Sequence, residues 1–92
     1  MKIAAEQIVW DGYHEIPDQQ DKEDAWDILL SLVDDPVPDE AEPNLWEWEG
    51  VPVAGYSITL PSGNGFVPYA PMEDEGTGEE VLRLWPVVWG NV

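Results

Sequence analysis

The sequence contains no cysteine, a single histidine and only three basic residues, Lys2, Lys22 and Arg83. The absence of cysteine excludes disulfides and thiolate zinc sites and is typical of proteins from a reducing cytoplasm. His14 alone cannot form a two-histidine metal site, and it has no serine or cysteine neighbour to act as a nucleophile. No apolar run approaches the roughly 20 residues of a membrane span, and the first residues do not form the apolar segment of a signal peptide. The sequence therefore predicts a cytoplasmic protein.

Acidic residues dominate what is present. Twenty Asp or Glu give a formal net charge of −17, and fourteen of them lie in residues 11–49, where Lys22 is the one basic residue. Residues 50–72 carry no charge at all. Such a chain repels nucleic acid and anionic lipid and attracts a strongly basic surface. Adaptation to high salt would spread the acids over the whole surface, so their segregation favours a binding role.

Length and composition indicate one small domain, residues 1–92. Six tryptophans and an apolar fraction of 43% make the chain too hydrophobic for a disordered acidic tail. We expect an α+β fold in which one principal helix packs on a small antiparallel sheet of about four or five strands.

The principal helix is expected at residues 18–33. Asp18 or Asp21 can cap its first turn, and the positive end of the helix dipole favours acids there. A buried stripe at helical spacing is formed by Ala25, Ile28, Leu29 and Leu32. Pro36 disfavours helical geometry at the residue before it and ends the helix.

The remaining segments indicate strands. Residues 2–10 read as a first strand, although residues 4–7 would also suit a short helix, and Asp11-Gly12 is a turn signal before a short strand at 13–16. Further strands are expected at 45–49, 51–60, 66–69 and 81–89. We expect Pro68 to place its strand at an edge of the sheet, and Pro86 to interrupt the last strand.

The acidic face of the helix is the main candidate binding surface. Acids at its N-terminus are explained by the helix dipole, but Asp34 and Asp35 stand at the end that prefers basic residues, by about 0.3–1 kcal/mol per charge. An outside partner would explain their presence. Glu47 and Glu49 alternate with Trp46 and Trp48 and extend the same surface. The predicted partner-binding residues are Asp24, Asp27, Asp34, Asp35, Asp39, Glu40, Glu42, Glu47 and Glu49.

Other chemistries have weaker support. The acidic loop at residues 73–80 does not have the ligand spacing of an EF-hand, and we expect no metal site, no cofactor and no catalytic activity. Some tryptophans can serve as exposed interface anchors. The pairs Trp46 with Trp48, and Trp85 with Trp89 on one side of the last strand, remain equal candidates.

In composition, with acids clustered at residues 11–49 and 73–80, the chain resembles the acidic DNA mimics of phages and mobile elements, including anti-CRISPR and anti-restriction inhibitors. The resemblance implies a bacterial host cell. It also implies a non-catalytic inhibitor that blocks a basic nucleic-acid-binding surface on a CRISPR effector, restriction enzyme or nuclease. These proteins share no motif and no single fold. The alternatives are an immunity protein or antitoxin that neutralises a basic nuclease toxin, and an acidic accessory subunit.

Overall fold

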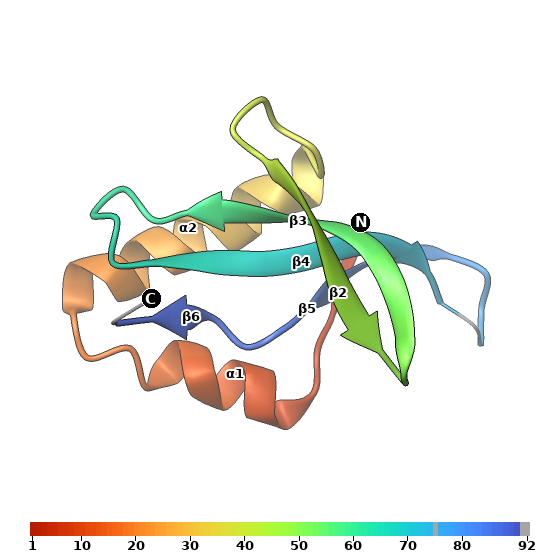
Figure 1. Ribbon diagram of the computed structural model, residues 1–92, viewed down its shortest axis with the longest axis horizontal. Helices are drawn as coiled ribbons and strands as arrows, with labels where there is room; N and C mark the ends of the chain where they lie inside the picture. Colours follow the sequence, from red (N-terminus) through yellow and green to blue (C-terminus); the bar gives the residue numbers. More distant parts are fainter. Residues whose placement is uncertain (75, 91–92) are drawn as a thin grey trace.

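The structure of the protein is a computed structural model that describes residues 1–74 and 76–90. Along these described residues, two helices and six strands follow one another, in the arrangement drawn in Figure 1. Their bounds are β1 (Lys2–Ala4), α1 (Gln7–His14), α2 (Gln19–Asp34), β2 (Glu42–Trp48), β3 (Val51–Thr59), β4 (Gly65–Glu73), β5 (Glu80–Leu84) and β6 (Val88–Trp89). The predicted α+β class is confirmed, with one more helix than expected and a larger sheet.

The sheet has the order β1-β5-β4-β3-β2, with β6 pairing to β4 beyond the end of β5. It is mixed rather than antiparallel, because β1 runs parallel to β5. One face carries the core, in which residues from both helices meet alternate residues of the central strands. The buried members of this core are Val9, Tyr13, Ile16, Ala25, Leu29, Leu32, Ile58, Leu60, Val67, Tyr69, Leu82 and Leu84.

Helix α2 confirms the predicted principal helix. Asp18 is its N-cap, and the Asp18 Oδ1 atom accepts a hydrogen bond from the Asp21 backbone N–H at 2.9 Å. Of the predicted stripe, Ala25, Leu29 and Leu32 are buried, and Ile28 is half-buried against the same core. The helix ends at Asp34, two residues before Pro36, where proline geometry excludes a further turn.

The prediction for residues 2–16 was wrong in most of its length. Only β1 is extended, and the predicted Asp11-Gly12 turn and the strand at 13–16 are replaced by α1 and the short segment that follows it. Val9, Tyr13 and Ile16 are buried at a spacing close to the helical period, which places all three against the core. Trp10 stacks on Trp26 of α2 with ring centroids 5.6 Å apart. This contact between distant residues stabilises a helix whose local sequence is ambiguous.

Pro68 lies in a central strand, so the edge-strand prediction was wrong. β4 pairs with β3, β5 and β6. Opposite Pro68 on the β5 side lies Trp85, just after β5 ends, and its backbone N–H donates to the Pro68 carbonyl at 3.2 Å. Because β5 and β6 are separated there by residues 85–87, the missing N–H of Pro68 falls at a gap in the ladder.

Glu49 also departs from its predicted place in a strand. It forms a two-residue turn with Gly50, and both residues have positive φ angles, 52° and 79°. Trp48 and Val51 close the hairpin on either side of this turn. Two successive residues at positive φ are typical of the tight turns that match strand twist, and Glu49 therefore does not continue the face of Glu47.

A buried carboxylate joins the first turn of α2 to the far end of the sheet. Asp21 is only 1% exposed, and its Oδ2 atom accepts hydrogen bonds from Trp89 Nε1 at 2.8 Å and Asn64 Nδ2 at 3.1 Å. Hydrogen bonds from the side chains of Ser62, Trp89 and Asn64 hold the pKa of Asp21 below its usual range. A buried charge with several donors is stabilised in its ionised form.

We expect Asp21→Asn to lower the melting temperature at pH 7 by several degrees, because Trp89 and Asn64 both lose their anionic acceptor. Since the folded-state pKa is depressed, the folded protein binds fewer protons than the unfolded chain, and this stabilisation declines as the pH falls below about 4. The difference in melting temperature between wild type and Asp21→Asn should therefore shrink in acid. The exposed Asp27→Asn is the control and should show little difference at any pH. A constant difference between pH 7 and pH 3 would contradict this role for Asp21.

Candidate partner-binding surface

One side of α2 presents a row of carboxylates to solvent. Asp27 and Asp34 are exposed and Asp24 is half-buried, and with Ser31 they fall on one face of the helix at a spacing of three or four residues. Gln20 Nε2 donates a hydrogen bond to Asp24 at 3.0 Å, which orients that carboxylate along the helix surface. The buried apolar residues of α2, Ala25, Leu29 and Leu32, lie on the opposite side, whereas Leu30 is exposed.

The C-terminal end of α2 adds charge where the helix dipole opposes it. Asp34 is the last residue of the helix, and Asp35 is its C-cap, with a backbone N–H that donates to the Ser31 carbonyl at 3.0 Å. The last turn contains no basic residue. Both side chains are exposed, so their repulsion from the helix terminus is reduced by solvent but not compensated by a cation of this turn.

The loop after α2 folds back to continue this row. Ser31, Asp35, Pro38, Asp39 and Glu40 line a shallow pocket of about 320 Å³. A turn closes the loop, in which the Ala41 backbone N–H donates to the Pro38 carbonyl at 3.0 Å. Through Ser31, which belongs to both, the helical row and the loop form one surface. We call it the acidic surface, and its carboxylates are Asp24, Asp27, Asp34, Asp35, Asp39 and Glu40.

A tyrosine from the sheet fixes the position of this loop. The Tyr69 hydroxyl donates to the Pro36 carbonyl at 2.6 Å. Burial above all, and then the nearby Tyr56, Asp35 and Glu40, raise the pKa of Tyr69 to about 12. A tyrosine hydroxyl is protonated at neutral pH in any case, and the raised pKa keeps this one a donor further into the alkaline range.

Three of the predicted residues lie outside the acidic surface. Glu42 is exposed at the start of β2, immediately after the loop, and borders the surface. Glu47 and Glu49 are also exposed, but they belong to the far end of the β2–β3 hairpin. At the rise of an extended strand, Glu47 is roughly 16 Å from Glu42. The structure therefore brings six of the nine predicted residues together, with Glu42 at the margin, and separates Glu47 and Glu49 from them.

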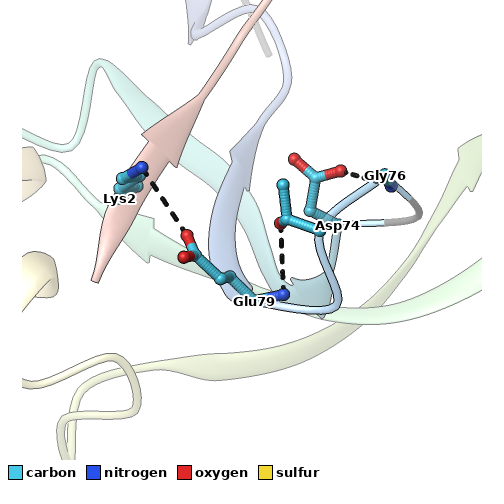
Figure 2. Close-up of polar contacts among 5 residues, drawn as sticks. Lys2, Asp74, Gly76 and Glu79 are labelled. Atoms are coloured by element: carbon cyan, nitrogen blue, oxygen red, sulfur yellow. Dashed lines mark hydrogen bonds and ion pairs between the residues drawn. The ribbon is translucent and has the colours of Figure 1, made fainter.

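Almost none of this charge is compensated by salt bridges. Within residues 1–74 and 76–90 there is one ion pair, between Lys2 Nζ and Glu79 at 3.6 Å (Figure 2). It lies at an acidic loop in which Asp74 accepts a hydrogen bond from the Gly76 backbone N–H at 2.8 Å. Glu75, part of the predicted 73–80 cluster, lies outside the described residues. Of the three basic residues, Arg83 does not pair with the acidic surface but stacks on Trp48, with its Cζ atom 4.1 Å from the ring centroid.

Among the described residues, no three His, Cys, Asp and Glu side chains are grouped so that they could hold a metal ion. His14 is exposed and packs against the Trp26 ring at 5.5 Å, as a surface residue. The pocket of the acidic surface contains carboxylates and one hydroxyl, without a basic group to activate a nucleophile. Such an arrangement is suited to binding cationic groups.

The tryptophans divide into three groups, which the sequence could not assign, and the first is the stacked pair of Trp10 and Trp26. All six are half-buried. Trp46, Trp48 and Trp85 cluster together on the sheet, whereas Trp89 binds Asp21. Trp85 and Trp89 are thus not companions on one face, because the chain breaks its strand at Pro86 between them. The exposure of Leu45, at 73%, was also not predicted. Its alternation with Trp46, which places the two side chains on opposite faces of the strand, was the signal that could have indicated it.

No family model and no curated protein matches this sequence. Among solved structures, the chain is similar to a YoeB/ParE toxin from Agrobacterium tumefaciens, with a TM-score of 0.66 and 15% sequence identity. The match covers 99% of this chain and 100% of the toxin. At this identity the likeness extends to the fold, and it spans both molecules from end to end. No helix among the described residues is long and apolar enough to cross a membrane.

We expect Asp34→Lys to raise the melting temperature, because it removes a charge that the helix C-terminus repels and adds one that it attracts. The gain should be about 0.3–1 kcal/mol at low ionic strength, and it should decrease in 0.5 M salt as screening increases. Glu6→Lys makes the same change in net charge at the N-cap of α1, where the dipole favours an acid, and serves as the control. Equal gains from both variants would show that total charge alone, and not the position of Asp34, determines stability.

Proposed function

We propose that this protein is a non-catalytic inhibitor that binds a basic nucleic-acid-binding surface of a partner and blocks access of the nucleic acid. In this proposal it is a DNA mimic of the anti-CRISPR or anti-restriction type, acting in a bacterial host cell. The observation that carries the proposal is the acidic surface of α2 and its following loop, whose carboxylates form no ion pair with any described residue. A basic groove would supply the missing counter-charges.

The dimensions of the surface favour mimicry of one phosphate backbone. Residues 24 to 35 span about 16 Å of helix axis, over which one DNA strand carries about five phosphates and the duplex about ten. Four carboxylates of the acidic surface lie within this span, Asp24, Asp27, Asp34 and Asp35, which is close to the number of phosphates on one strand, and Asp39, Glu40 and the marginal Glu42 follow in the loop and at the start of β2. The hairpin tip with Glu47 and Glu49 lies too far along β2 to fill the second strand at the same place.

The position of the carboxylates on ordered elements also supports the proposal. The row on α2 is held by a helix that packs on the core, and the loop is attached to β4 by the Tyr69 hydrogen bond. Charges that are already in place lose less conformational entropy on binding than charges on a disordered tail. A fixed acidic pattern is what competition with the regular spacing of phosphates requires.

The fold favours a second candidate, a role in a toxin system. The likeness to a YoeB/ParE toxin supports descent from, or association with, such a system. In this alternative the chain is an immunity protein or antitoxin that neutralises a basic nuclease toxin. It would use the same acidic surface. The identity of the protein captured by this chain from host lysate would separate the two candidates.

The direct test is charge reversal at three exposed positions of the acidic surface, Asp27→Lys, Asp34→Lys and Asp35→Lys together. We expect the folded state to be retained and the affinity for the captured partner to fall by well over tenfold, most strongly at low salt. Isothermal titration calorimetry at two salt concentrations measures the loss of affinity and its dependence on salt.

The matched control reverses Glu6, Glu15 and Glu73, which are exposed and lie outside the predicted site. It makes the same change in net charge and should reduce affinity much less. If the two triple variants weaken binding equally, the protein binds through its overall charge and the proposed surface is wrong. If neither weakens binding, the partner does not recognise charge at all, and the inhibitor proposal fails.

A further inference from the structure

The β2–β3 hairpin contains an apolar trough beside the acidic surface. Three successive cross-strand pairs line it, Pro43 with Tyr56, Asn44 with Gly55 and Leu45 with Ala54, and it is a shallow space of about 300 Å³ that is open to solvent. The lining is mainly apolar, and Leu45 exposes 73% of its surface there. Single exposed leucines are common on protein surfaces, but one that lines a concave apolar site is typical of a binding surface.

Two tyrosines connect this trough to the acidic surface. Tyr56 lines the trough and packs against Tyr69 with ring centroids 5.8 Å apart. Tyr69 in turn donates to Pro36, and the charges of Asp35 and Glu40 act on its hydroxyl. Glu42 also immediately precedes Pro43 in the chain. The trough thus lies next to carboxylates at its β2 start and at its Tyr56 side.

We propose that the trough is the docking site for an apolar side chain carried by a Lys/Arg-rich segment of a partner protein. The inference rests on the proposed function, which requires a basic partner, and it specifies how that partner is held beyond charge. Charge complementarity decides the occupant. A second copy of this chain would bring another formal charge of −17 to the same place, and nucleic acid or anionic lipid would be repelled in the same way.

The side chains of the trough, and not the backbone edge of β2, are suited to this contact. β2 is the last strand of the sheet, but Pro43 has no backbone N–H, which interrupts the ladder that an added strand would form. The Asn44 side chain is occupied by a hydrogen bond to Ser57 at 2.8 Å. Apolar surface on Pro43, Leu45, Ala54 and Tyr56 remains for a partner side chain. Burial of apolar surface then supplies affinity and register, while the carboxylates attract the basic residues.

Three synthetic 12-residue peptides test the proposal. The first has Lys and Arg residues around a central Leu, the second has Ser in place of that Leu, and the third keeps the Leu but has Gln in place of Lys and Arg. Binding to the ¹⁵N-labelled full chain is followed by NMR. We expect the first peptide to bind at least about tenfold more tightly than either of the others. Its chemical-shift changes should centre on Leu45, Ala54 and Tyr56.

A matched pair of variants distinguishes binding at the trough from nonspecific binding to other exposed apolar residues of the hairpin. Leu45→Asn should remove the preference for the Leu peptide over the Ser peptide. Val51→Asn alters another exposed apolar residue of the same hairpin, 59% exposed and outside the trough, and should retain that preference. Because both side chains are largely exposed, both variants should fold as the wild type does.

The remaining outcomes overturn the proposal in distinguishable ways. Equal binding of the Leu and Ser peptides, weakened for both by the Asp27, Asp34 and Asp35 reversal, would refute the trough and leave the acidic surface intact. Equal binding unaffected by that reversal would refute the proposed function as well. Shifts at Leu45 and Ala54 that grow with protein concentration in the absence of peptide would identify a second copy as the occupant, contrary to the inference.

Discussion

Uncompensated negative charge is the constraint on which the arrangement of this protein depends. With twenty acids and three basic residues, most carboxylates cannot find a cation within the chain and must remain in water. Charge is therefore excluded from β3 and from nearly all of β4, the strands that line the middle of the core, and is gathered on α2 and the loops. The exception is Asp21, which is buried and ionised because several side-chain donors surround it. The same interaction attaches the start of α2 to β6, and α2 carries the acidic row.

The two faces of α2 thus serve two purposes that depend on each other. Leu29 and Leu32 hold the helix against the sheet, and this fixes the direction in which Asp27 and Asp34 project. Tyr69 extends the arrangement by holding the loop through Pro36. The acidic surface is consequently held by elements that pack on the core and by the Tyr69 hydrogen bond, and the trough at Leu45 lies beside it. The relation of this chain to the YoeB/ParE toxin is one of fold. What this chain binds depends on its own charge and side chains.

The sequence predicted the parts of the structure that follow from local chemistry. The cap at Asp18, the stripe of α2, the stop before Pro36 and the break at Pro86 each depend on residues close together in the chain, and each was found. The errors concern residues 2–16, Pro68 and Glu49, whose conformations depend on distant partners. Val9 and Tyr13 form a helix because α2 and the sheet bury them. Pro68 is tolerated in a central strand because the ladder of β4 with β5 ends opposite it, at Trp85. The alignment of Asp24, Asp27 and Asp34 was predictable from helical spacing. The return of the loop with Asp39 and Glu40 to this row, and the separation of Glu47 and Glu49 from it, depend on the course of the chain outside the helix.

Competition between this protein and nucleic acid for one site on the partner is the most direct test of the DNA-mimic proposal. The partner, once captured and purified, is loaded with fluorescently labelled DNA or RNA, whichever it binds, and the anisotropy is followed as this protein is added. If the acidic surface takes the place of a phosphate backbone, the anisotropy falls to the value of free nucleic acid, because the protein and the nucleic acid exclude each other. A ternary complex, in which the protein binds the partner while anisotropy stays high, would contradict the claim that the acidic surface occupies the place of a phosphate backbone.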